Sequence, residues 1–254
     1  MDEYKKLLNC NRNGFDFFNI DDDVLLEQHQ RYYKNSKDNY EKMYRPVSML
    51  EEWNDSRYKH PNLQLPHAKI VDTVKDIKPK SICEIGAGVG MVSKFVHHAL
   101  PESKLICVEG SLHHIEVMKE NFKESSDVIA PKMNVQAEII NALAQDLPLE
   151  DNSVELIYTC TLMMHIPFVM VPFCMKEFAR VSSKYVLHVE NLNDIINAVE
   201  YGELELDRNL NSLVIDYEKM YSEVGMEHVK SERWKDLHAP CDYVLHLFKK
   251  TDTK

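Results

Sequence analysis

The sequence predicts an α/β protein in which helices cover both faces of a mostly parallel, doubly wound sheet. Three observations lead to this fold class. Strand-like and helix-like patterns alternate between about residues 67 and 248. A short glycine-rich turn joins the first strand pattern to the next helix pattern. With 254 residues, of which 44% are hydrophobic, the chain is long enough to bury one full core.

Residues 1–66 come before the alternating pattern, and we expect them to form an N-terminal helical lid or cap. The acidic residues at 21–23 are suitable N-caps, because apolar side chains with helical spacing follow them. The same spacing continues over residues 40–47, where Pro46 breaks or bends the helix. No composition shift marks another boundary, so residues 67–254 are predicted to form one main domain.

The main domain is predicted to begin with a helix over residues 67–76, which leads into the first strand. Ser111 is a suitable N-cap for the helix after the second strand, and Gly225 suits the left-handed position after the last helix. The predicted strands cover residues 81–85, 104–108, 135–140, 154–158, 185–190, 228–234 and 243–248. The predicted helices begin at Met91 and cover residues 111–123, 168–181 and 216–225.

Charge and cysteine content narrow the classes of partner and the expected compartment. The formal net charge is −11 and no dense block of Lys and Arg occurs, so nucleic acid is not an expected partner. The six cysteines form no C-x-x-C pair, and the charged first residues lack the apolar stretch of a signal peptide. We therefore expect a protein of the reducing cytoplasm.

One uncharged stretch is long enough on paper to cross a membrane. Residues 156–175 carry no formal charge over 20 positions. Polar residues, Pro167 and Pro172 interrupt the stretch, and the α/β pattern divides it into a strand, a loop and a helix. We expect no membrane span.

The glycine-rich turn is the most informative segment of the chain. Three of the seven glycines, Gly86, Gly88 and Gly90, occupy alternate positions between a strand pattern and a helix pattern. Such a strand–turn–helix unit commonly holds a nucleotide-like ligand at the helix N-terminus. A dinucleotide fingerprint would need its third glycine at residue 91, which is Met91, and a phosphate-binding G-x-x-x-x-G-K-[ST] loop is absent from the chain.

The pattern E-x-G-x-G-x-G, from Glu84 to Gly90, resembles motif I of the class I S-adenosylmethionine-dependent methyltransferases. Residues 144–157 resemble the family's "D-A-x-x-LP-F-x-D-x-S-F-D-x-V" segment, and the chain as a whole resembles the small-molecule, type 11-like subgroup. The resemblance covers residues 77–248. It implies a Rossmann-like, doubly wound sheet of seven strands with a C-terminal antiparallel hairpin. S-adenosylmethionine would bind across the carboxyl ends of the strands, between the first and the fourth.

The resemblance also implies which residues contact the cofactor. Glu109 ends the second strand, where a carboxylate accepts both ribose hydroxyls; the alternative is a solvated loop carboxylate. Glu84 would organise the glycine turn and approach the cofactor's ammonium group, or would simply pair with a lysine. Leu143 stands where the family has an Asp for adenine, so residues 144–146 would contact adenine instead. The remaining implied contacts are Gly86, Ala87, Gly88, Gly90, Gly110, Ser111, Ala144, Gln145, Asp146 and Thr159.

His165 is the candidate catalytic residue. It lies in a stretch after the fourth strand that resembles the family's "S-x-x-x-L-x-H-h" segment, which faces the transferred methyl group. An imidazole with a pKa of about 6.5 can accept a proton from an attacking hydroxyl or amine. The alternative is a histidine that only packs or forms hydrogen bonds. The other histidines lack the partner spacing of a metal site, and we predict none.

We therefore expect a methyltransferase that modifies an oxygen or nitrogen atom of a small-molecule acceptor. A protein or peptide acceptor is an alternative within this class. A fold that binds S-adenosylmethionine without catalysis is a second alternative, to which Leu143 gives weight. A nucleotide-dependent oxidoreductase is a third, against which Met91 and the two C-terminal strands argue.

Overall fold

The computed structural model describes residues 66–123, 133–163, 166, 171–192, 217–235 and 242–251. The lid expected over residues 1–66 lies outside them, apart from Pro66, which begins the first described helix. The candidate catalytic residue His165 and the expected helix cap Asp216 also lie outside the described residues.

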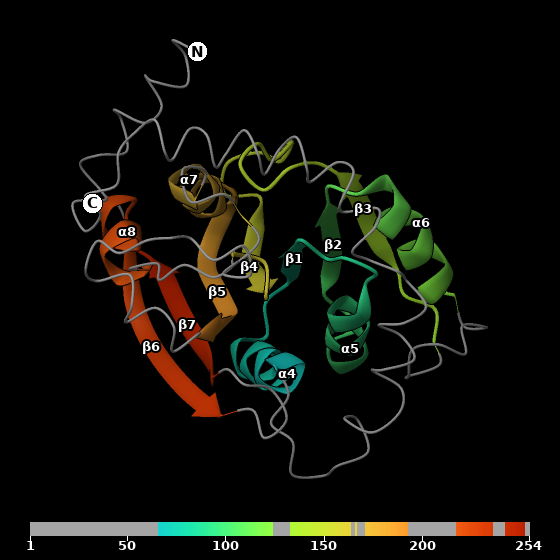
Figure 1. Cartoon of the computed structure of the whole chain (residues 1–254), viewed down its shortest axis with the longest axis horizontal. Coiled ribbons are helices and arrows are strands. Elements are labelled where there is room, and N and C mark those ends of the chain that lie inside the picture. Colours follow the sequence, from blue (N-terminus) through green and yellow to red (C-terminus); the bar gives the residue numbers. More distant parts are fainter. Residues whose placement is uncertain are drawn as a thin grey trace, which may run out of the picture.

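The described strands form one mixed, seven-stranded sheet with the order β3-β2-β1-β4-β5-β7-β6 (Figure 1). Strands β1 to β5 pair in parallel, whereas β7 is antiparallel to both β5 and β6. The expected fold class and the C-terminal hairpin are thus confirmed. The strands are β1 (Ser81–Ile85), β2 (Lys104–Glu109), β3 (Ala137–Asn141), β4 (Val154–Cys160), β5 (Ser182–Leu192), β6 (Met226–Lys235) and β7 (Asp242–Lys250).

Helices cover both faces of the sheet, which divides the core into two clusters. Three helices contribute to one cluster: α4 (Pro66–Ile77), α5 (Met91–Ala99) and α6 (Leu112–Asn121). Two helices contribute to the other: α7 (Val171–Val181) and α8 (Tyr217–Glu223). The central strands are apolar on both sides because each side meets helices, as parallel strands require.

The order of the strands places a switch point beside the glycine turn. β1 pairs with β2 on one side and with β4 on the other, so the chain leaves β1 toward one half of the sheet and returns later to build the second half. In an open α/β sheet, ligands bind outside the carboxyl ends of the strands at such a point. The end of β1 at Ile85 is therefore where the fold places a binding site.

Five strands are longer than expected, namely β2, β4, β5, β6 and β7, whereas β3 begins at Ala137 instead of residue 135. β5 covers residues 182–192 instead of 185–190, because β4 pairs with it from Ser182 to Val189 and β7 pairs with it up to Leu192. β4 continues to Cys160, which pairs with Val189 of β5. Long-range pairing, which no local pattern records, sets these ends.

Candidate active site

The turn after β1 has the backbone conformation that its glycines permit. Gly86, Gly88 and Gly90 have φ values of 72°, 54° and 79°, which side chains disfavour. The N–H groups of Gly86 and Ala87 donate to the carbonyl of Val108 at 2.9 and 3.0 Å, so the turn is attached to the end of β2. Gly90 is the N-cap residue of α5, and the helix begins at Met91 as expected.

The three glycines differ in what surrounds them. A Cβ atom on Gly86 would lie 2.5 Å from Cδ1 of Leu162, and one on Gly90 would lie 2.5 Å from Phe122. These two positions are closed by the protein's own side chains. A Cβ atom on Gly88, in contrast, would meet no atom within 4 Å. The middle of the turn therefore exposes its backbone to open space, as a ligand-binding turn does.

Glu109 connects the turn after β1 with the turn after β2. Its carboxylate accepts hydrogen bonds from the backbone N–H of Gly88 and of Ser111, both at 2.8 Å, and His114 Nδ1 lies 3.6 Å away. The residue is 7% exposed. A carboxylate oxygen has two acceptor sites, so each oxygen keeps one for a ligand hydroxyl.

The surroundings of Glu109 favour its charged form. Burial would raise the pKa of this carboxyl, but the contacts from His114, Ser111 and Gly88 outweigh burial, and the pKa lies below its usual range. The carboxylate is thus charged, and two backbone N–H groups hold it before any ligand arrives. Such a group suits the two hydroxyls of a ribose.

Two asparagines, which the sequence patterns did not single out, support these turns. Asn121 donates its amide to the carbonyl of Val89 at 2.9 Å, inside the glycine turn. Asn141 donates to the carbonyls of Glu109 and Gly110 at 2.9 and 3.0 Å. Each asparagine is the last residue of its element, where a polar side chain ending an apolar segment is the only local signal.

Glu84 lies at the base of the site, buried within the sheet. One of its carboxylate oxygens accepts the hydroxyl of Ser93 and, at 2.8 Å, the hydroxyl of Tyr158. Burial raises the pKa of Glu84 to about 7, although these hydrogen bonds lower it. The contacts of this side chain within the described residues are with Ser93 and Tyr158, and they do not support the alternative of a partner lysine. Its approach to a cofactor ammonium group stays a prediction.

The segment between β3 and β4 lies beside the turn after β2. Leu143 is 51% exposed, and its Cδ2 would lie 3.2 Å from a Cβ atom on Gly110. Ala144 is buried, and the N–H of Asp146 donates to the carbonyl of Leu143 at 3.1 Å. The fold thus brings Gly110 and residues 143–146 together. Their contact with adenine stays a prediction.

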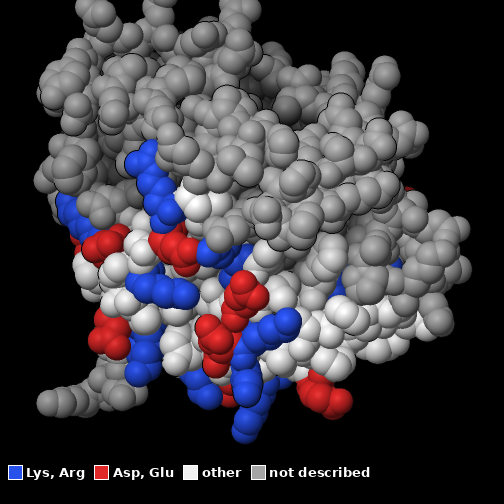
Figure 2. Space-filling view, turned by 90° about the horizontal axis from the view of Figure 1, so that it is seen from below, with Lys and Arg blue, Asp and Glu red and all other residues white. Residues whose placement is uncertain are grey.

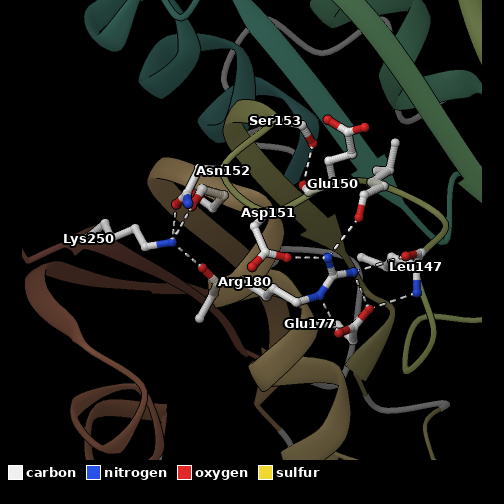
Figure 3. A network of polar contacts seen from close by, with 11 residues as sticks. Leu147, Glu150, Asp151, Asn152, Ser153, Glu177, Arg180 and Lys250 are labelled. Carbon is white, nitrogen blue, oxygen red and sulfur yellow. Dashed lines mark hydrogen bonds and ion pairs between the residues drawn. The ribbon is translucent and has the colours of Figure 1, made fainter.

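A polar network on α7 fixes this segment (Figure 3). The guanidinium of Arg180 donates to the carbonyls of Leu147 and Leu149 at 3.0 and 2.8 Å, and it forms ion pairs with Glu177 and Asp151. Glu177 in turn accepts the N–H of Leu147 at 2.9 Å. The expected structural role of Glu177 and Arg180 is therefore specific: they hold both backbone groups of the residue that follows Asp146.

The side chains of Ser111 and Thr159 already form hydrogen bonds within the protein. The hydroxyl of Ser111 accepts the N–H of His114, which confirms the expected N-cap of α6. Thr159 is fully buried, and its hydroxyl contacts Glu190 and His188, each at 2.7 Å. Any contact of Thr159 with a cofactor would thus involve its backbone.

The described residues contain no group of three or more His, Cys, Asp and Glu side chains that could hold a metal ion. Among those same residues, no helix combines the length and the apolar character that a membrane crossing needs. The uncharged stretch at 156–175 contributes instead to β4 and to the start of α7.

The sheet order, the glycine turn at the switch point and the buried carboxylate after β2 together define a class I methyltransferase fold. The comparison with known families agrees: residues 82–184 match the family described as a methyltransferase domain. Residues 82–184 therefore carry a methyltransferase domain, whose cofactor is S-adenosylmethionine. A search of curated proteins gives no match.

Solved structures share this fold at low sequence identity. A SAM-dependent methyltransferase from Methanosarcina mazei is 15% identical with a TM-score of 0.54, covering 68% of this chain and 93% of its own. Magnesium protoporphyrin IX methyltransferase from Synechocystis, with bound SAH, is 12% identical with a TM-score of 0.55, covering 75% and 85%. The cyclase SpnF is also 12% identical with a TM-score of 0.55, covering 73% and 81%. These likenesses concern the fold, which hosts more than one chemistry.

Proposed function

We propose that this protein transfers the methyl group of S-adenosylmethionine to an oxygen or nitrogen atom of a small-molecule acceptor. The observation that carries the proposal is the pairing of Gly88 with Glu109 at the carboxyl edge of the sheet. The turn is open at Gly88, and the carboxylate bound to it is charged. This arrangement offers backbone N–H groups and hydroxyl acceptors side by side.

The residues present fit the proposed cofactor. Glu109 would hold the ribose, and the backbone around Gly88 would hold the amino acid portion. Leu112 and Leu143 are 66% and 51% exposed; Leu112 follows Gly110 by two residues, and the side chain of Leu143 lies beside Gly110. Apolar side chains at this place suit the faces of an adenine ring in the absence of the family's Asp. When bound, the cofactor supplies a methyl group on a positively charged sulfur.

The protein's own contribution to this reaction is chiefly alignment and exclusion of water. Alignment of two reactants can lower a barrier by about 7–11 kcal/mol. A base is needed only when the acceptor arrives protonated, and it adds about 10²–10⁴-fold. His165 is our candidate for that base, and its position in the sequence, two residues after the described loop at 161–163, supports the assignment.

The charge of the chain argues against a nucleic acid as the acceptor. The net charge of −11 disfavours a nucleic acid backbone. Figure 2 shows acidic and basic side chains interspersed over the described residues of one face. A mixed surface of this kind provides no strip of positive charge for a phosphate chain to follow.

Calorimetric titration with S-adenosylhomocysteine tests the proposal first. We expect micromolar binding by the wild-type protein, and loss of binding in both Glu109→Ala and Gly88→Leu variants. No binding by a well-folded wild-type protein would overturn the proposal. A panel of small hydroxyl and amine acceptors, with peptides beside them, then tests the substrate class. Turnover of peptides alone would replace the small-molecule acceptor by a protein one, and His165→Ala tests the base.

A further inference from the structure

A row of buried polar side chains lies beneath the loop that follows β4. Its members are Thr159 on β4, His188 and Glu190 on β5, and Tyr221 on α8, none more than 4% exposed. His188 and Glu190 are two positions apart on one strand, so their side chains point to the same face of the sheet. Thr159 is the partner of His188 in the pairing of β4 with β5.

These four side chains form one chain of hydrogen bonds. The hydroxyl of Tyr221 lies 2.6 Å from His188 Nε2, and His188 Nδ1 lies 2.7 Å from the hydroxyl of Thr159. The hydroxyl of Thr159 lies 2.7 Å from Glu190 Oε1. A neutral imidazole has one donor and one acceptor nitrogen, so the direction of one bond fixes the direction of the next.

The carboxylate of Glu190 also holds the loop after β4. Its Oε1 accepts the N–H of Leu162 at 3.3 Å, and its Oε2 accepts the N–H of Met163 at 3.1 Å. The side chain of Leu162 in turn lies against Gly86, the first glycine of the glycine turn. Glu190 therefore connects the buried row to the loop, and the loop connects it to the turn.

We propose that Glu190 is a positioning residue for the methyl transfer proposed above, on which this inference rests. Its ionised carboxylate holds the loop after β4 against the glycine turn. The tautomer of His188 follows the proton state of that carboxylate. Glu190 contacts neither cofactor nor acceptor in this scheme and acts through Leu162 and Met163.

The hydrogen-bond chain has two self-consistent directions. With Glu190 ionised, Tyr221 donates to Nε2 of His188, Nδ1–H donates to Thr159, and Thr159 donates to the carboxylate. With one proton added from solvent, Glu190 donates to Thr159, Thr159 donates to Nδ1, and Nε2–H donates to Tyr221. His188 stays neutral in both states and only its tautomer changes. The neutral acid is a weaker acceptor, so it holds the loop N–H groups less firmly.

Within this row, Glu190 is the group whose charge changes near neutral pH. Burial raises the pKa of Glu190 to about 7, although bonds from Thr159, Leu162 and Met163 lower it. Burial lowers the pKa of His188 well below its usual value and that of His246 to about 4. Burial raises the pKa of each of the other titratable neighbours, which are Cys160, Cys174, Tyr217 and Tyr221.

Nuclear magnetic resonance on the cofactor-free protein tests the inference without any acceptor. The measured quantities are the ring nitrogen shifts of His188 and the exchange rates of the Leu162 and Met163 amides, between about pH 5.5 and pH 8.5. We expect the wild-type protein to change its His188 tautomer and to protect both amides better at the higher pH. Glu190→Gln should fix the tautomer and speed exchange of both amides at least about tenfold.

Two further variants separate the contributions. Glu84→Gln removes the other buried carboxyl with a pKa near 7 and should leave the His188 tautomer change intact. Thr159→Val keeps the shape of the side chain but breaks the row, so it should abolish the tautomer change and keep both amides protected. This variant tests the row even if Glu190→Gln fails to fold. Unchanged amide protection in Glu190→Gln, or a persistent tautomer change in Thr159→Val, would overturn the inference.

Titration with S-adenosylhomocysteine then distinguishes this inference from the proposed function. We expect Glu190→Gln to remain folded and to bind about tenfold more weakly than wild type at about pH 8. If wild type and variant bind equally well, the positioning role falls and the proposed function stands. If the wild-type protein does not bind while the resonance results hold, the proposed function falls and the loop-anchoring role of Glu190 stands.

Discussion

The backbone N–H of Gly88 and the carboxylate of Glu109 meet at 2.8 Å, although 21 residues separate them in the chain. The contact joins the turns after β1 and β2 across the edge of the sheet. One residue supplies an open backbone, and the other supplies the charge that orders it. The first two predictions concern the two sides of this contact.

Replacing Glu109 by Gln should weaken binding of S-adenosylhomocysteine by about 10–100-fold, the usual cost of losing hydrogen bonds to a charged group. The amide nitrogen of Gln would face either the N–H of Gly88 or that of Ser111, so one of the two bonds is lost. Calorimetry measures the effect. Glu120→Gln is a matched control on α6, because Glu120 is 71% exposed and forms an exposed ion pair with its neighbour Lys123. Equal affinity in both variants would contradict the ribose role of Glu109.

The glycines of the turn should differ in their sensitivity to a methyl group. Gly90→Ala should lower the free energy of unfolding by about 2–4 kcal/mol, because its Cβ would collide with Phe122 and Met118 in addition to the unfavourable φ. Gly88→Ala should cost only about 1–2 kcal/mol, since only the φ value opposes it. Urea unfolding measures both. A larger loss in Gly88→Ala would show that the space around it is closed.

Arg180→Ala should destabilise the fold by about 2 kcal/mol, because the carbonyls of Leu147 and Leu149 and the carboxylate of Glu177 lose their donor. Lys184→Ala, which breaks an exposed pair with Glu155, should cost less than about 1 kcal/mol. Cofactor affinity should fall only in the first variant. Urea unfolding measures stability and calorimetry measures cofactor affinity. Similar losses in both variants would contradict the idea that Arg180 and Glu177 hold the backbone of Leu147 in place.

The stability that Glu177 contributes through its ion pair with Arg180 should also depend on pH, with a known sign. The ion pair with Arg180 holds the pKa of Glu177 below its usual range. The carboxyl of Glu177 therefore takes up its proton at a higher pH in the unfolded chain than in the folded protein. The stability from Glu177 is present above the usual carboxyl pKa and is lost as the pH falls through the lowered value. In Glu177→Gln, the difference in stability from wild type should shrink below about pH 4.

The contribution of Glu84 to stability should depend on pH with the opposite sign. Its folded pKa is raised to about 7 by burial, so between the usual value and about 7 the folded protein binds the extra proton. Its contribution to stability is thus complete at low pH and is lost as the pH rises through this window. Relative to wild type, Glu84→Gln should gain about 1–3 kcal/mol between about pH 5 and pH 8. Denaturation at several pH values measures the difference, in which the buried histidines common to both proteins cancel. A flat difference would contradict the raised pKa.

Features that depend only on a few neighbouring residues could be predicted from the sequence. Ser111 caps its helix, and Gly225 has a φ value of 77° after α8, because both depend on a few neighbouring residues. The glycine turn and Glu109 lie where strand ends must meet in a parallel sheet. The fold class followed from the same alternation of patterns, and the sheet order confirms it.

The buried row escaped prediction because its contacts join distant residues. Thr159, His188 and Tyr221 come from three elements, with 29 and 33 residues between the bonded pairs. The sequence did hold one signal: His188 and Glu190 alternate with the apolar, buried residues Leu187 and Val189 in one strand. Two polar groups on the same face of a buried strand need partners, but the pattern does not say which ones.

The fit between Gly86 and Leu162 carries a consequence for the evolution of this chain. An added methyl group at position 86 would collide with a flexible side chain and not with backbone, so the collision disappears if residue 162 becomes smaller. We expect related chains with alanine at position 86 to carry a short side chain at position 162. The two positions, which are in contact although they lie far apart in the chain, should therefore mutate as a pair.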